Sequence, residues 1–227
     1  MRALILPGLD GCADLRREFV AALGSDIEAT VVDYPKTAAL GYDELADRAW
    51  ERLPHGEDFM LVGESFSGPI AIKLAARRPE GLAGLVLCAS FARTPIPMAA
   101  WLGRLAPVLP LRAMPMPLVM HAMMGRWATP DWKRRLREAI EGLAPPVLRR
   151  RVTEVMSADA THELADVRCP VLCIEASSDR LLLLDTWKAV VRARSRATRV
   201  VVEGPHMLLQ ANPYGCTTAI RSWLRAL

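Results

Sequence analysis

The sequence predicts an α/β fold in which a mostly parallel sheet of about six strands is covered by helices on both faces. Short, almost continuously apolar segments alternate with segments of helical periodicity, as expected for parallel strands that are buried on both sides. This alternation stops near residue 92 and resumes near residue 166. The 227 residues suffice for one large α/β domain with a substantial core.

Each element can be justified in order along the chain. The apolar segments that we expect to form strands are 2–6, 28–33, 59–63, 83–88, 170–175 and 198–202. Helices are expected in the core at 14–23, 42–53, 66–77, 185–194 and 207–226. Asp43 and Glu44 suit the first turn of the second helix, because acidic residues favour a helix N-terminus. Arg77-Arg78-Pro79 suits the end of the third helix, and Asp185 is the expected N-cap of the fourth.

Residues 92–165 are rich in proline, methionine, leucine and arginine, and they contain no convincing strand. Helical periodicity is found at Met98–Leu105, Pro117–Gly125, Asp131–Gly142 and Pro146–Ala158. The sequence therefore predicts a core made of residues 1–91 and 166–227, with a helical insertion at 92–165. Large apolar side chains of this insertion either line an adaptable pocket or pack it onto the core. Trp101 and Met120 are the candidates for the pocket wall.

A candidate nucleophile lies at the turn between the third strand and the next helix. Gly63-Glu64-Ser65-Phe66-Ser67-Gly68 follows the apolar run 59–62, which places Ser65 at a sharp strand–turn–helix junction. The small residues on either side fit a tight turn, and the helix N-terminus favours developing negative charge. A serine at such a turn can also be a simple N-cap. Ser67 is the rival nucleophile in this segment.

Two further polar residues follow later strands. Asp179 comes after strand 170–175, and His206 comes after strand 198–202. Ser65, Asp179 and His206 thus all lie just past the carboxyl ends of strands, where sites form in open parallel sheets. Histidine suits the role of base because it titrates near neutral pH, and an aspartate can hold its tautomer. Asp159 and Asp166 are alternative acids.

The chain order Ser, Asp, His resembles that of the α/β-hydrolase fold superfamily. The resemblance rests on Pro7-Gly8-Leu9-Asp10-Gly11, the Ser65 turn, Ser178-Asp179-Arg180 and Gly204-Pro205-His206, and so covers nearly the whole chain. It implies a helical cap at 92–165 and an oxyanion hole made by the backbone N–H groups of Leu9 and Phe66. Family members often have His-Gly where this chain has Pro7-Gly8. Because the donor is a main-chain N–H group, this difference leaves its role intact.

The resemblance is greatest to small capped serine carboxylesterases. It implies cleavage of a carboxylic ester or thioester of a partly apolar small molecule through an acyl-enzyme. Carbon–carbon bond hydrolysis or perhydrolysis by the same three residues remains an alternative, as does a ligand-binding protein that has kept the fold.

Composition narrows the classes of partner. The net charge of +4 is modest, and aromatic residues are not interleaved with basic ones, so we expect no nucleic-acid partner. The runs Lys133-Arg134-Arg135 and Arg149-Arg150-Arg151 are interpreted as solvated helix faces. The five cysteines form neither a disulfide framework nor a zinc motif, so we expect no metal or other cofactor. Prolines interrupt the longest apolar tract, and no signal peptide is apparent, which predicts a cytoplasmic protein without stable membrane insertion.

Overall fold

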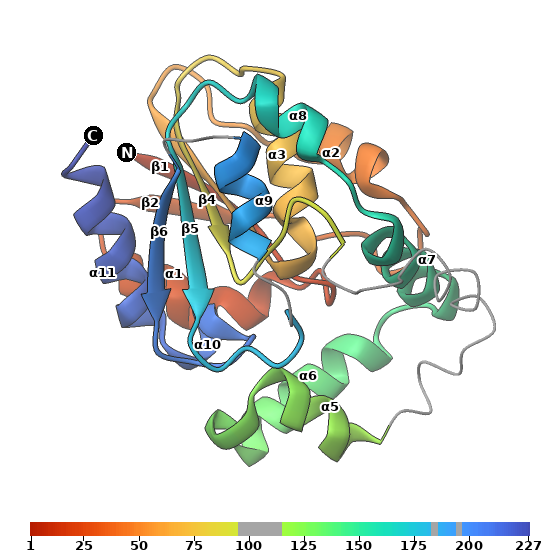
Figure 1. The fold of residues 1–227 in the computed structure, drawn as a ribbon. Coiled ribbons are helices and arrows are strands. Elements are labelled where there is room, and N and C mark those ends of the chain that lie inside the picture. The colour runs from red at the N-terminus through yellow and green to blue at the C-terminus, as the bar shows by residue number, and fades with distance from the viewer. Residues whose placement is uncertain (95–114, 183–185, 194–196) are drawn as a thin grey trace.

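A computed structural model describes residues 1–94, 115–182, 186–193 and 197–227. Within these residues, six strands form a single parallel sheet with the order β2-β1-β3-β4-β5-β6 (Figure 1). The strands are β1 (Arg2–Leu6), β2 (Glu28–Val31), β3 (Phe59–Glu64), β4 (Leu82–Cys88), β5 (Val171–Ala176) and β6 (Thr198–Val202). The predicted α/β class and parallel sheet are therefore confirmed.

Alternate side chains of each central strand enter two separate apolar layers. In β1, Leu4 and Leu6 pack on one face of the sheet, whereas Ala3 and Ile5 pack on the other, as the period of two in a strand requires. The first face is covered by α2 (Tyr42–Trp50), α3 (Gly68–Ala76), α8 (Thr161–Asp166) and α9 (Thr186–Ala193). The second is covered by α1 (Arg17–Leu23), α10 (Leu208–Ala211) and α11 (Pro213–Leu224) (Figure 1).

The middle of the sheet is the most deeply buried part. All six residues of β3 are buried, because β1 and β4 pair with it on both sides and helices cover both faces. A strand held in this way fixes the position of the turn that follows it. That turn is the 3₁₀ helix η2 (Ser65–Ser67), which leads directly into α3.

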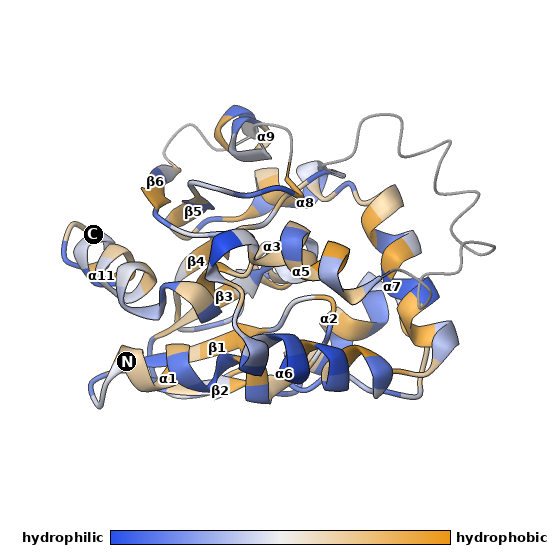
Figure 2. Ribbon diagram, turned by 90° about the horizontal axis from the view of Figure 1, so that it is seen from below, coloured by the Kyte–Doolittle hydropathy of each residue, from blue (hydrophilic) through white to orange (hydrophobic). Residues whose placement is uncertain are grey.

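Three of the helices described between β4 and β5 lie beyond the carboxyl ends of the strands (Figure 1). They are α5 (Met116–Met123), α6 (Pro130–Glu141) and α7 (Pro145–Ser157), and each has a proline in its first turn, where the missing N–H costs nothing. The short 3₁₀ helix η5 (Gly125–Trp127) joins α5 to α6. Much of α6 is hydrophilic (Figure 2). We refer to α5, α6 and α7 as the cap; the predicted helix Met98–Leu105 and the predicted N-cap Asp185 lie outside the described residues.

Two predictions about local structure are wrong. The expected helix 207–226 is two helices, because Asn212 ends α10 and its side chain accepts a hydrogen bond from the N–H of Gly215 at the start of α11. In the run Arg149-Arg150-Arg151, the first two residues are exposed but Arg151 is buried. No helix in the described ranges combines the length and the apolar character that crossing a bilayer requires.

Candidate active site

Ser65 occupies a strained position at the end of β3. Its φ of 48° lies in the left-handed region, which a residue with a side chain adopts only at a cost of about 1–3 kcal/mol. The turn is tight around it. A β-carbon at Gly63 would lie 2.8 Å from Cβ of Ala71 and 2.9 Å from the carbonyl oxygen of Ser67. The glycine therefore lets α3 approach β3 closely, and the predicted strand–turn–helix is present.

The structure brings Ser65, His206 and Asp179 together in one chain of hydrogen bonds. Oγ of Ser65 lies 2.7 Å from Nε2 of His206, and Nδ1 of His206 lies 2.8 Å from Oδ2 of Asp179. These residues come from three different strand ends, 141 residues apart in sequence between the serine and the histidine. The histidine is almost fully buried, with 3% of its surface exposed. The geometry is that of a nucleophile, a base and an orienting carboxylate.

The carboxylate of Asp179 is held in its charged form. Burial disfavours the charge, but the hydrogen bond and the charge of His206 act in the opposite direction. The other oxygen, Oδ1, accepts hydrogen bonds from the N–H groups of Leu181 and Leu182 at 2.8 and 2.9 Å. Together these interactions outweigh desolvation and lower the pKa of Asp179 below its ordinary value. An ionised carboxylate can accept a hydrogen bond from Nδ1–H of His206, which leaves Nε2 free to accept a proton from Ser65.

The alternative residues are engaged elsewhere. The Ser67 hydroxyl is fully buried, donates to the carbonyl of Pro7, and lies 2.7 Å from the hydroxyl of Tyr34. Asp159 accepts hydrogen bonds from Thr161, and Asp166 pairs with Arg78. The structure thus gives each of these side chains a local partner away from His206.

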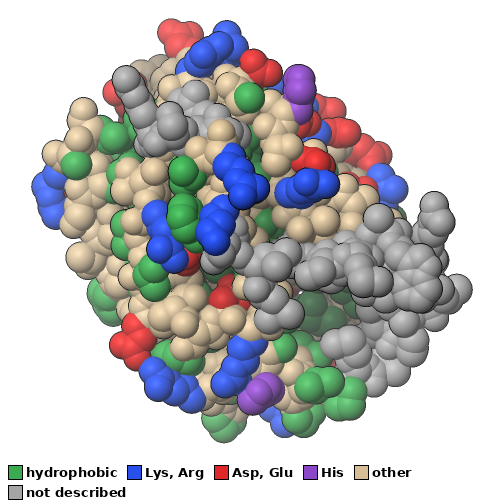
Figure 3. All heavy atoms as spheres, in the orientation of Figure 1, with side chains coloured by type: hydrophobic (Ala, Val, Ile, Leu, Met, Phe, Trp, Pro, Cys, Tyr) green, Lys and Arg blue, Asp and Glu red, His purple; other side chains and the backbone are tan. Residues whose placement is uncertain are grey.

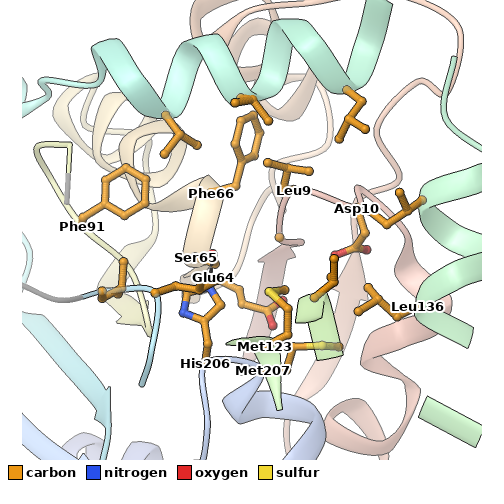
Figure 4. Close-up of a pocket in the computed structure, with 18 of the residues that line it drawn as sticks. Leu9, Asp10, Glu64, Ser65, Phe66, Phe91, Met123, Leu136, His206 and Met207 are labelled. Carbon is orange, nitrogen blue, oxygen red and sulfur yellow. Dashed lines mark hydrogen bonds between the residues drawn. The ribbon is translucent and has the colours of Figure 1, made fainter. Parts of the chain in front are cut away.

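A cavity of about 300 Å³ opens beside Ser65 and His206. Leu9 and Phe66, whose N–H groups the sequence proposed as oxyanion donors, both line it, and Figure 4 shows them on the same side of Ser65. Most of the wall is apolar. The cap contributes Val119, Met123, Leu136, Ile140, Leu148, Val152 and Val155. The core contributes apolar side chains from the segments that follow five strands, namely Leu9, Phe66, Phe91, Leu181, Leu182 and Met207.

The two residues proposed for the pocket wall have different outcomes. Trp101 lies outside the described residues. Met120 is 4% exposed and packs in a cluster with Leu15, Met124 and Leu136. The described wall from α5 is instead formed by Val119 and Met123. In Figure 3, charged and apolar side chains are mixed over the described part of the face that is shown.

A buried charged network lies at the polar side of the cavity. Arg16 donates to Glu64 through Nε at 2.6 Å and to Asp10 through Nη2 at 2.9 Å. Glu64 also accepts from Gln210 at 2.9 Å. The network thus joins the loop after β1, the Ser65 turn and the helix after His206. Sequence reasoning missed it, although Asp10 and Glu64 stand in the two motifs that pointed to the site.

The cap is attached to both loops that carry His206 and Asp179. The N–H of Met207, the residue after His206, donates to the carbonyl of Met123 at 3.0 Å. The guanidinium of Arg180, the residue after Asp179, donates to the carbonyl of His121 at 3.2 Å. Among the described residues, no cluster of three or more His, Cys, Asp or Glu side chains could hold a metal ion.

The model of one protein family, described as the alpha/beta hydrolase family, matches residues 3–215. No curated protein matches the chain. A thermophilic esterase from Thermogutta terrifontis has a similar structure, with a TM-score of 0.73 at 23% identity over 100% of this chain and 90% of that one. A hydrolase from Oleispira antarctica aligns with a TM-score of 0.82 at 12% identity, over 100% and 91% of the two chains. The enol-lactonase from Burkholderia xenovorans gives 0.74 at 17% identity, over 99% and 91%.

Proposed function

Because the chain belongs to the alpha/beta hydrolase family, we propose that it is a serine hydrolase that cleaves a carboxylic ester or thioester of a partly apolar small molecule. The observation that carries this proposal is the Ser65–His206–Asp179 hydrogen-bonded chain at the wall of an apolar cavity. Each of these three side chains has the hydrogen-bond partner that its proposed role requires. Neither a metal nor another cofactor enters the proposed reaction.

The first half of the reaction acylates Ser65. As Oγ attacks the carbonyl carbon of the ester, His206 accepts the hydroxyl proton at Nε2. Asp179 stabilises the resulting imidazolium through the hydrogen bond at Nδ1 and remains ionised. The carbonyl oxygen becomes an oxyanion that accepts hydrogen bonds from the N–H groups of Leu9 and Phe66. When the tetrahedral intermediate collapses, His206 returns the proton to the leaving alcohol or thiol.

The second half regenerates the enzyme. A water molecule takes the place of the alcohol or thiol, gives one proton to His206 and attacks the acyl carbon. Collapse of the second tetrahedral intermediate breaks the bond to Oγ, and His206 returns the proton to Ser65. The products are a carboxylic acid and the free hydroxyl of Ser65, so no further reactant is consumed.

The cavity supports an apolar acyl or alcohol portion in the substrate. Its wall is formed largely by leucine, valine, isoleucine, phenylalanine and methionine side chains from the cap and the core. Each methylene buried there contributes up to about 0.8 kcal/mol of binding. Methionine is flexible, so Met123 and Met207 favour tolerance of several chain lengths over one sharp optimum.

Active-site labelling tests the proposal. A fluorophosphonate probe should modify Ser65, as identified by mass spectrometry of the labelled peptide, and Ser65→Ala should abolish the labelling. Turnover of p-nitrophenyl esters should fall by about 10³-fold or more in Ser65→Ala, while the circular dichroism spectrum stays that of the wild type. Labelling at Ser67, or unchanged turnover in Ser65→Ala, would contradict the assignment. Thioester and diketone substrates assayed beside the esters identify the bond that is cleaved.

A further inference from the structure

Arg151 is one of the two largest fully buried side chains among the described residues, and it lies on the cap helix α7. Its guanidinium reaches the loop that follows β1. Nη1 donates to the carbonyl of Leu9 at 2.7 Å, and Nη2 donates to the carbonyl of Pro35 at 3.0 Å. The guanidinium also lies over the ring of Tyr34, 5.5 Å from its centre. A cation of the cap is therefore bonded to the main chain of a proposed oxyanion donor.

The loop is shaped to receive this guanidinium. Gly11 has a φ of 69°, and a β-carbon there would lie 2.5 Å from Nη1 of Arg151. The carbonyl of Gly11 accepts from the N–H of Tyr34 at 3.0 Å, which holds the far end of the loop. The absence of a side chain at residue 11 thus leaves the space that Arg151 fills.

Two anchors lie on either side of the Leu9 N–H group. On one side, the buried Ser67 hydroxyl donates to the carbonyl of Pro7. On the other, Arg151 donates to the carbonyl of Leu9 itself. The peptide that carries the Leu9 N–H lies between these two fixed carbonyls, and its own carbonyl, that of Gly8, accepts from the N–H of Gly11 at 2.9 Å. The orientation of this peptide therefore depends on Arg151 together with these core hydrogen bonds. The first anchor belongs to the core, whereas the second is supplied by the cap.

The neighbours of Arg151 on α7 face the cavity. Leu148, Val152 and Val155 all line it, three positions before and one and four positions after the arginine. One helix therefore contacts both the space for the substrate and the backbone of the oxyanion donor. Packing alone does not require a charge at residue 151, because burying a guanidinium costs far more than burying an apolar side chain of the same length. Charge-assisted hydrogen bonds to carbonyls offset that cost, and they also orient the groups that they hold.

We propose that Arg151 is a positioning residue, through which the cap holds the Leu9 N–H in the orientation that stabilises the oxyanion. This inference rests on the proposed function, because it assumes a tetrahedral oxyanion at Ser65. Arg151 touches neither substrate nor reacting atoms; it acts through the Leu9 peptide. Its loss should weaken transition-state stabilisation while leaving the apolar pocket in place.

The test replaces Arg151 with methionine, which keeps the length of the side chain and removes its charge. Since a misplaced oxyanion donor costs less than a deleted one, we expect kcat to fall by about 10–100-fold with KM changed by less than about threefold. The loss should be the same for p-nitrophenyl acetate, butyrate and octanoate, because every ester places its oxyanion at the same donors. The rate of labelling by a fluorophosphonate should fall by a similar factor, since its phosphoryl oxygen uses the same N–H groups.

Arg149→Met is the matched control, because Arg149 is an exposed arginine on the same helix. Its kcat should stay within about twofold of the wild type. A wild-type kcat in Arg151→Met overturns the inference. A loss that grows with acyl chain length overturns it as well, because that pattern indicates altered packing of α7 against the substrate. If Arg151→Met does not fold, Arg151→Lys keeps the charge without the planar fork; a reduced kcat at unchanged KM supports the inference, and an unchanged kcat overturns it.

These outcomes are separate from failure of the proposed function. If the wild-type protein neither hydrolyses an ester nor reacts with the probe, the assignment of Ser65 is wrong and the inference falls with it. If the wild type is active and Arg151→Met is equally active, only the role of Arg151 is wrong.

Discussion

Replacing Arg16 with methionine removes a guanidinium that separates two buried carboxylates. The side chain of Arg16 is 2% exposed, and those of Asp10 and Glu64 are 7% and 3% exposed. Arg16 also donates to the carbonyl of Cys12 at 2.9 Å. Methionine fills a similar length of space, so the change in the free energy of unfolding reports mainly the loss of charge and hydrogen bonds.

The expected loss in the free energy of unfolding follows from the two buried carboxylates that remain in Arg16→Met. Removing one member of a buried ion pair costs about 3–5 kcal/mol, because its partner remains charged and desolvated. In Arg16→Met two carboxylates are left, so we expect a loss at the upper end of that range at pH 7. Since domains are stable by about 5–15 kcal/mol, the variant should remain folded but be easily denatured.

Urea denaturation followed by circular dichroism at pH 7 measures the loss of stability. Arg17→Met is the matched control, because Arg17 is the next residue and its pair with Asp14 is 74% and 76% exposed. The control should change the free energy of unfolding by less than about 0.5 kcal/mol. A loss below about 1 kcal/mol in Arg16→Met at pH 7 would refute the reasoning that this network carries buried charge.

Two further predictions concern catalysis and selectivity. His206→Ala and Asp179→Asn should each lower kcat by orders of magnitude. The double variant should be little less active than His206→Ala, because residues that act as a unit have non-additive effects. A near-normal kcat in Asp179→Asn would indicate that Asp159 or Asp166 is the acid. Val155→Ala should shift the acyl chain-length profile of kcat/KM towards longer chains, because Val155 lines the cavity. Met120→Ala should leave that profile unchanged and lower Tm, because Met120 packs between the cap and the core. A profile changed by Met120→Ala and unchanged by Val155→Ala would show that the cavity wall has been assigned to the wrong residues of α5 and α7.

The parts of the fold that sequence predicts well are those governed by local patterns. The strands could be located because their residues are apolar almost without interruption, and β3 is indeed buried at every position. The serine, aspartate and histidine could be selected because each follows such a strand. The break at Asn212 was also available from sequence, since Asn-Pro favours a turn and Asn212 caps α11.

The buried arginines could not be predicted in the same way. Arg16 pairs with Glu64, 48 residues away, and Arg151 binds the carbonyl of Leu9, 142 residues away. In sequence, Arg151 is one of three consecutive arginines, and nothing local separates it from its exposed neighbours. Only the docking of α7 on the loop after β1 distinguishes them. The same reason explains Met120, because the choice between Met120 and Met123 for the cavity wall depends on how α5 is rotated against the core.

The hydrogen bond between Met207 and Met123 affects which substitutions in the cap the protein can tolerate. It joins one main-chain group to another, so it does not depend on which side chains the two residues carry. Substitutions on the cavity-facing side of α5 can therefore alter which molecules fit, while the loop next to His206 keeps its attachment. The side chains of α5 that line the cavity can therefore vary independently of the position of His206. Substitutions in the cap can thus change which molecules bind while the position of His206 stays the same.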